Sequence, residues 1–228
     1  MRILLAALLV AMAALVGAPA RAADMPEYPD IEIPEVDYGL SGSFYLRGSA
    51  AGNLEWAREH ISTTGCVCLP PTSPGYGYSV GAGFGYETGT GLRVDVTADY
   101  LQNSGLSNGV NTLHLRGGVA LANAYYDFSF GGDALSGGWG AYIGAGLGGA
   151  YYQTHVTGVG APADGHGFSP VVAGMAGVQY DMGTVVADVG YRVMYLPQIS
   201  NNTPGASSFY LNDNTVHEVR GTLRYRFQ

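Results

Sequence analysis

Charged side chains occur at alternate positions along several segments of this sequence. In the segment over residues 215–227, four charged residues alternate with an apolar set that ends in two aromatic residues. Because successive side chains on a strand point to opposite faces, this spacing predicts a strand with one charged and one apolar face. Arginine keeps its charge and offers five hydrogen-bond donors, so it suits buried pairing with carboxylates. The charged positions are Glu218, Arg220, Arg224 and Arg226, and the apolar ones are Val219, Leu223, Tyr225 and Phe227.

The same spacing recurs in other segments and places most of the arginines together with acidic residues on the non-apolar face. Their neighbours on that face are mostly Gly, Ser, Thr and Ala, which leave room for long guanidinium groups. We predict a luminal charge cluster inside a barrel, either as paired charges that fill it or as a narrow ion path. The cluster comprises Arg47, Arg93, Asp95, Asp99, Arg116, Asp188, Arg192, Glu218, Arg220 and Arg224.

Other residues whose types could do chemistry form weaker patterns. Cys66 and Cys68 could form a loop disulfide after export, and an intermolecular bridge or a pair of metal ligands are the alternatives. His155, Asp164 and His166 share one polar segment, where solvated histidines are a simpler interpretation than a metal or catalytic site. We therefore predict no catalytic residue, no cofactor and no metal, and hence no enzyme.

Segments with a side-chain period of two recur eight times, and longer and shorter connections alternate between them. This pattern predicts an all-β, eight-stranded antiparallel up-and-down barrel. On the strand over residues 113–125 we expect Arg116 to point inward, and the opposite face to point outward with Leu113, Leu115, Val119, Leu121 and Tyr125. The expected strands cover residues 43–51, 76–87, 92–100, 113–125, 139–152, 172–180, 185–195 and 215–227.

Residues 1–22 have the pattern of a cleaved secretory signal peptide. Arg2 precedes an apolar run, and Ala20-Arg21-Ala22 fits a cleavage site. We interpret residues 23–41, which are acidic and contain prolines, as a periplasmic leader, and residues 42–228 as the barrel. The processed chain would carry eight arginines, no lysine and 18 acidic residues, and its net charge of −10 argues against a nucleic-acid partner.

Two kinds of barrel could use strands with one apolar and one charged face. A soluble barrel buries the apolar face, whereas a membrane barrel turns that face to lipid and keeps the charges inside. The absence of lysine, the small residues beside the charges and the aromatic residues near strand ends favour the membrane barrel. We therefore predict that the protein lies in the bacterial outer membrane. A signal peptide that is cleaved off would direct its export.

Four segments carry a resemblance to a known family: Asn123–Phe128, Ala141–Gly148, Asp188–Arg192 and Leu223–Phe227. They resemble the small outer membrane β-barrel family, which includes the opacity-type surface antigens of the porin family and the transmembrane domain of outer membrane protein A. The resemblance covers roughly residues 42–227. The sequence departs from the family pattern at Ala141, where proline is common, and at Gln228, which follows the usual terminal phenylalanine.

The resemblance implies a structural or surface-interaction role through extracellular loops. The implied partners are outer membrane lipid, the barrel-assembly machinery acting on the C-terminal strand, and a host or cell-surface ligand. One alternative is a small diffusion channel gated by the luminal Arg–Asp/Glu pairs. A more remote alternative is a lipid-modifying enzyme that would use His155 and Ser169.

Overall fold

The computed structural model describes residues 42–62, 72–130, 137–202 and 209–227, and all helix-or-strand structure in these ranges is strand. The predicted signal peptide and acidic leader lie outside the described residues, as do Cys66 and Cys68. The described ranges contain no helix that is both long and apolar enough to cross a membrane. The strands are β1 (Ser43–Trp56), β2 (Glu59–Ser62), β3 (Gly75–Glu87), β4 (Leu92–Ser107), β5 (Asn111–Ser129), β6 (Gly138–Gly158), β7 (Gly165–Asp181), β8 (Val185–Ser200) and β9 (Phe209–Arg226).

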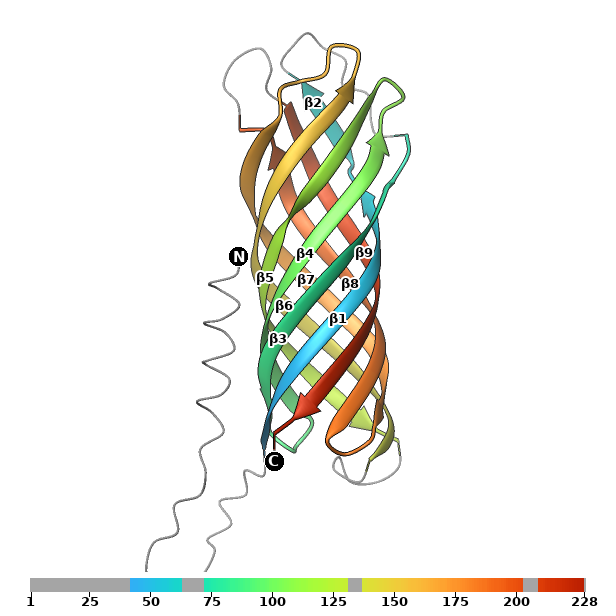
Figure 1. Ribbon diagram of the computed structural model, residues 1–228, viewed down its shortest axis with the longest axis vertical. Helices are drawn as coiled ribbons and strands as arrows, with labels where there is room; N and C mark the ends of the chain where they lie inside the picture. The colour runs from blue at the N-terminus through green and yellow to red at the C-terminus, as the bar shows by residue number, and fades with distance from the viewer. Residues whose placement is uncertain (1–41, 63–71, 131–136, 203–208, 228) are drawn as a thin grey trace, which may run out of the picture. The chain divides into compact units, whose positions relative to one another are not determined.

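Eight long strands of the described chain form one closed antiparallel barrel (Figure 1). From β3 to β9 each strand pairs with the next in sequence, and β1 closes the ring by pairing with both β3 and β9. The short β2 pairs only with the first residues of β9. Closure gives the backbone of each long strand a partner on both sides, as a barrel in a lipid bilayer requires. The predicted eight-stranded up-and-down barrel is confirmed.

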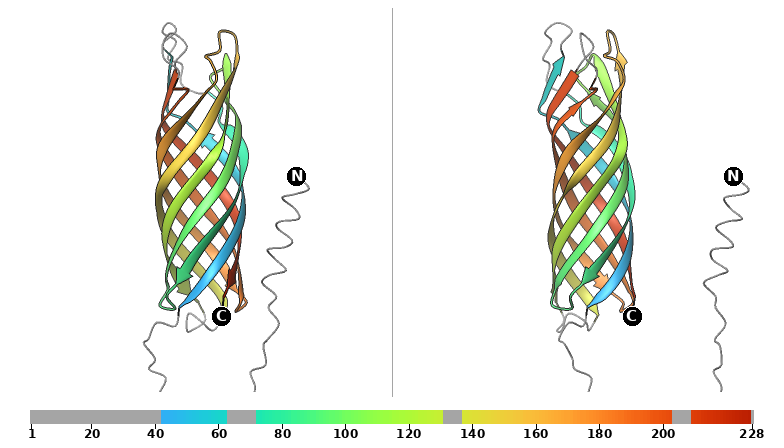
Figure 2. Two further views of the ribbon diagram at one scale, coloured as in Figure 1. Left: turned by 60° about the vertical axis from the view of Figure 1, so that its left-hand side comes forward. Right: turned by 90° about the vertical axis from the view of Figure 1, so that its left-hand side faces the viewer.

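The two ends of the barrel differ in their connections. At the end that we call the inner end, β1 begins and β9 ends, and Tyr45 pairs with Arg226. Short turns at the inner end join β3 to β4 and β7 to β8, and Gly89, Gly91 and Gly183 supply the positive φ angles of these turns. At the opposite, outer end the hairpins project unequally, as the turned views in Figure 2 show.

The outside of the barrel is apolar over its middle and aromatic toward both ends. On β1 the exposed Phe44 and Leu46 alternate with the buried Tyr45 and Arg47. This is the alternation of a barrel whose outer face meets lipid, with aromatic girdles at the two interfaces. The exposed aromatic residues include Phe44, Phe128, Trp139, Tyr180 and Phe227 toward the inner end, and Trp56, Tyr76, Tyr100, Tyr151 and Phe168 toward the outer end.

The predicted orientation of β5 is wrong. The leucine-bearing face of this strand points into the barrel, and Leu121 is only 1% exposed. The outward face carries small residues instead, and Arg116 is exposed on it. The error arose because the prediction assumed a polar interior along the whole barrel, whereas its outer part has an apolar interior. The buried hydrophobic residues of this face are Leu113, Leu115, Val119, Leu121 and Tyr125.

Several strands are longer at the outer end than predicted. β4 continues to Ser107 and β5 begins at Asn111, inside a segment that we expected to be a loop. β6 likewise runs to Gly158, and β7 begins at Gly165. Beyond the membrane both faces of a hairpin can carry polar residues, so hydrophobic alternation does not mark where these strands end.

Candidate functional site: the filled barrel interior

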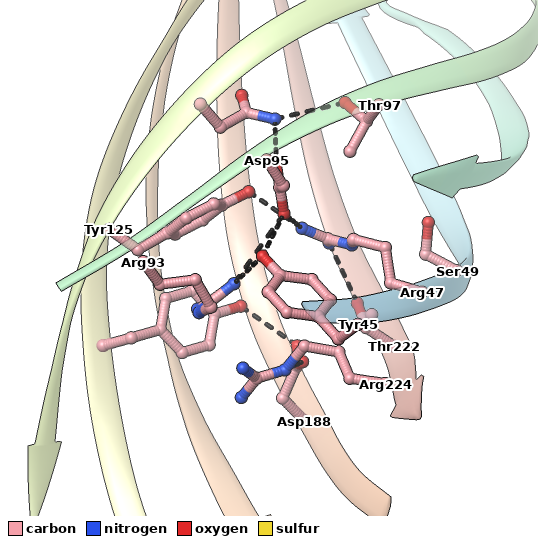
Figure 3. A network of polar contacts seen from close by, with 12 residues as sticks. Tyr45, Arg47, Ser49, Arg93, Asp95, Thr97, Tyr125, Asp188, Thr222 and Arg224 are labelled. Atoms are coloured by element: carbon pink, nitrogen blue, oxygen red, sulfur yellow. Dashed lines mark hydrogen bonds and ion pairs between the residues drawn. The ribbon is translucent and has the colours of Figure 1, made fainter. Parts of the chain in front are cut away.

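The inner half of the barrel interior is occupied by a network of charged and tyrosine side chains (Figure 3). Asp95 is its centre: its carboxylate accepts hydrogen bonds from Tyr45 Oη at 2.9 Å and Arg47 Nη1 at 2.8 Å. Asn123 Nδ2 donates to its other oxygen at 2.7 Å. These donors come from β1 and β5, on either side of β4, so the network ties strands that are distant in sequence.

Arg93 occupies a second position in this network. Its Nε and Nη2 donate to the two oxygens of Asp127, both at 3.0 Å, in the bidentate geometry that only a guanidinium provides. Its guanidinium carbon lies 4.0 Å from the centre of the Tyr125 ring. Charge pairing and cation–π contact together fix an arginine whose side chain is 2% exposed.

Farther toward the middle of the barrel, two arginines and two acids form a closed ring of alternating charge. Arg192 contacts Asp99 at 2.7 Å and Glu218 at 2.6 Å. Arg220 contacts the same two carboxylates at 2.8 Å and 3.0 Å. Both acids are essentially completely buried, and each has two cations beside it. The arrangement compensates the desolvation of both carboxylates, which would be costly if either lacked its partners.

A third group of charges closes the inner end. Arg226 pairs with Glu87 and, at 2.6 Å, with Asp181. Arg224 donates to Gln179 and lies 3.8 Å from Asp188. Across the described interior, six arginines therefore meet seven carboxylates in ion pairs. The charges of these pairs therefore nearly cancel.

Glycines on neighbouring strands make room for the tyrosines of the network. A Cβ atom added to Gly177 would lie 2.7 Å from the Tyr142 ring, closer than real Cβ contacts allow. Tyr142 in turn donates its hydroxyl to Asp188 at 3.1 Å. The glycine-rich inner faces predicted from the sequence are therefore filled by aromatic rings from adjacent strands.

The outer half of the interior is mostly apolar, although Glu55, Asn103 and Asn214 are also buried there. Side chains from six of the long strands, together with Ala57 just after β1, pack into one cluster, which we call the apolar plug, and Ile199 and Leu121 in it are at most 1% exposed. This region explains why the leucine-bearing face of β5 points inward and not outward as predicted, because these leucines belong to the plug. The plug comprises Ala57, Leu101, Leu106, Leu113, Leu115, Val119, Leu121, Ala150, Tyr152, Val171, Ala173, Met194, Leu196, Ile199, Phe209, Leu211 and Val216.

Little space remains inside the network. A cavity bounded by Arg47, Arg192 and Arg220 has a volume of about 10 Å³, which is about the smallest volume that holds one water molecule. Each of these arginines has one buried nitrogen without a protein partner: Arg47 Nε, Arg192 Nη2 and Arg220 Nε.

The structure brings together nine of the ten residues predicted for the charge cluster. Arg116 is the exception and a correction: it lies on the outer surface, where its Nε donates to Gln153 at 3.0 Å. The prediction missed several members of the network. Asp127 shares the face of Tyr125, and Glu87 shares the glycine face of β3, so the same alternation could have identified both. The missed members are Tyr45, Glu87, Asn123, Tyr125, Asp127, Tyr142, Gln179 and Asp181, whereas Arg226 was expected on the charged face without being assigned to the cluster.

The other candidate groups do not converge on a reaction site. His155 is exposed and pairs with Asp164, with 2.7 Å between Nδ1 and Oδ1. Ser169 faces inward, is 1% exposed and donates to the carbonyl of Pro170. His155 and Ser169 thus lie on opposite faces of the barrel wall. Within the described ranges, no group of three or more His, Cys, Asp or Glu residues is arranged to hold a metal ion.

A closed eight-stranded barrel with an apolar outside and a paired, charged inside is the architecture of small outer membrane proteins, and comparison with solved structures finds the same fold. Neisserial surface protein A matches with a TM-score of 0.56 and 21% identity over 81% of this chain and 97% of that one. The Yersinia pestis attachment invasion locus protein Ail, solved in complex with the heparin analogue sucrose octasulfate, has a TM-score of 0.45 and 14% identity, covering 82% of this chain and 99% of that one. The outer membrane protein OprG of Pseudomonas aeruginosa has a TM-score of 0.43 and 15% identity, covering 82% of this chain and 97% of that one. No family model and no curated protein sequence matches the chain.

Proposed function

We propose that this protein is a closed outer membrane barrel that acts through its outside: a structural or surface-interaction protein whose extracellular loops make its contacts. The observation that carries the proposal is the filled interior. Charged pairs occupy its inner half and the apolar plug occupies its outer half. A barrel filled in this way offers lipid-facing and loop surfaces for function, and the space left within its charge network is only about 10 Å³.

The filled interior also argues against the small diffusion channel as the primary function. An ion crossing the barrel would have to break pairs such as Arg192–Glu218, which are buried and bonded at 2.6 Å. It would then meet the plug, whose packed apolar side chains leave no open path, although Asn53, Glu55 and Asn103 are buried beside them. Both obstacles lie in series along the axis, so opening the charge pairs alone would not create a path.

Planar-bilayer recordings test the closed barrel. We expect purified, refolded protein to give no reproducible conductance steps, with insertion verified by heat-modifiable migration of protein recovered from the same preparation. A variant in which Leu121 and Leu115 are both replaced by serine weakens the plug and serves as the comparison. Reproducible unit steps from the unmodified protein would overturn the closed-barrel proposal.

Surface display tests the role of the loops. An epitope inserted between residues 203 and 208 should be labelled by antibody on intact cells, because this segment connects β8 to β9 at the outer end. An epitope inserted in the turn at Gly89 is the matched control, and it should be labelled only after the outer membrane is permeabilised. If intact cells were labelled at Gly89 and not between residues 203 and 208, the barrel would have the opposite orientation, and the proposed surface role of these loops would be wrong.

A further inference from the structure

Arg116 and its neighbours form a polar pocket on the outside of the barrel. The pocket has a volume of about 610 Å³ and is lined by side chains of β4, β5, β6 and β7, among them Gln102, His114, Arg116, Gln153, His155 and His166. These side chains face away from the plug, so they play no part in filling the interior.

Strand register places this pocket directly outside an aromatic belt. Tyr100, Gly118, Tyr151 and Phe168 are successive partners across four strands, and all three aromatic residues are exposed. Two residues farther outward along the same strands, the partners are Gln102, Arg116, Gln153 and His166. Aromatic belts mark the membrane interface, so the polar row lies at the level of lipid headgroups.

Arg116 is the cation of this pocket, and most of its hydrogen-bonding capacity is unused by the protein. Only its Nε has a hydrogen-bond partner among the described residues, the side chain of Gln153. The carboxylate at the rim, Asp164, is already paired with His155 at 2.7 Å. A guanidinium with two free nitrogens at headgroup level is suited to bidentate contact with a phosphate.

An apolar groove lies below the pocket on the same strands. It has a volume of about 720 Å³, and its floor includes Ala122, Ala124 and Ala145, with Val96, Leu147 and Phe84 among its walls. Gly118 and Ala120 continue the outward face of β5 from the groove to Arg116. The eight steps from Arg116 to Ala124 extend about 27 Å at ~3.4 Å per residue, and at a tilt of about 45° they span about 19 Å of depth. That depth exceeds one leaflet of a ~30 Å hydrocarbon core.

We propose that the outward face of β4–β6 binds one molecule of the phosphorylated, multiply acylated glycolipid of the outer leaflet, with a phosphate on Arg116 and an acyl chain in the alanine groove. The proposal rests on the outer membrane location proposed above. The pocket opens at the end opposite the one where β1 begins and β9 ends, which places it in the outer leaflet. The cation and the groove lie on the same strands, as a single amphipathic lipid requires.

Binding of purified lipids to the refolded full-length chain tests the proposal. Protein in a neutral detergent is titrated with diphosphoryl lipid A, with dephosphorylated lipid A and with phosphatidylglycerol, and complexes are counted by native mass spectrometry. We expect diphosphoryl lipid A to bind at least tenfold more tightly than either of the other two. Arg116→Gln should weaken its binding about tenfold, because a charge-assisted contact to phosphate is lost, and Ala122→Phe should do so by filling the groove.

Two matched variants control for unspecific effects. Arg58→Gln removes another exposed arginine, and Ala50→Phe enlarges an exposed alanine on β1, so both should bind within twofold of the unmodified protein. Heat-modifiable migration verifies folding, and Ala120→Leu replaces Ala122→Phe if the latter does not fold. The proposed site would be overturned if diphosphoryl lipid A did not bind, or if dephosphorylated lipid A or phosphatidylglycerol bound as tightly as it does. It would also be overturned if Arg116→Gln bound diphosphoryl lipid A as tightly as the unmodified protein. Such a failure with a folded, non-conducting barrel would leave the proposed function intact.

Discussion

Arginine has two different environments in this barrel, and the environment decides what each residue does. Arg192 and Arg220 lie inside, each bonded to the same two carboxylates, and their charge is compensated locally. Arg116 lies outside at the edge of the aromatic belt, where a charge can reach water and headgroups. Sequence alternation alone cannot distinguish these three arginines. It separates the two faces of a strand, but it does not say which face points into the barrel.

Removing one arginine from the buried ring should destabilise the barrel strongly. Arg192→Leu leaves Asp99 and Glu218 buried with one cation fewer, and we expect a loss of about 3–5 kcal/mol. The measurement is the urea midpoint of unfolding from lipid vesicles, followed by tryptophan fluorescence. Arg58→Leu is the control, because Arg58 is exposed and should change stability by no more than about 0.5 kcal/mol. Equal stability of the two variants would mean that the ring contributes nothing.

A glycine that accommodates Tyr142 should not tolerate a methyl group. Gly177→Ala would push the ring away and lengthen the hydroxyl contact to Asp188, at a cost of about 1–3 kcal/mol. Gly221→Ala is the control, because nothing lies within 4 Å of a Cβ atom at that position. The same vesicle unfolding assay compares them, and a Gly221→Ala effect as large as that of Gly177→Ala would contradict the packing argument.

At the scale of the strand, β5 shows how far periodicity can be used. Its period of two was predictable, and its pairing with β4 and β6 followed from an up-and-down order. Its orientation was not, because leucines fill the interior at one end of the barrel while alanines suffice to face lipid. The charges on β9 were assigned correctly from the same kind of pattern, since that strand has charges on one face and large apolar residues on the other.

Truncating a leucine on each face of the wall should distinguish the two surfaces. Leu121→Ala opens a cavity in the apolar plug and should cost about 2–5 kcal/mol. Leu147→Ala removes the same atoms from a side chain that is 65% exposed toward lipid, and no cavity follows. We expect it to cost less than about 1.5 kcal/mol in the same unfolding measurement. A larger loss at Leu147 than at Leu121 would contradict the orientation of β5.

At the scale of the whole molecule, the interior divides into a charged inner half and a mostly apolar outer half, and this division follows from which strands meet. The sequence predicted the closed barrel and nine residues of the charge cluster. It could not predict the plug, because the plug forms only when β4, β5, β6, β7, β8 and β9 bring separate apolar residues to one level. The polar pocket on the outside was likewise invisible, since its residues come from four strands.

The most direct measurement of which side faces lipid is a nitroxide scan of β5 from residue 117 to residue 125, with Cys66 and Cys68 replaced by serine and the protein in lipid vesicles. Power saturation compares collisions with oxygen, which is concentrated in the hydrocarbon, and with a water-soluble nickel chelate. The structure predicts oxygen maxima at positions 118, 120, 122 and 124, and low accessibility to both reagents at 119, 121 and 123. Oxygen maxima at the odd-numbered positions, or nickel access at 122, would contradict it.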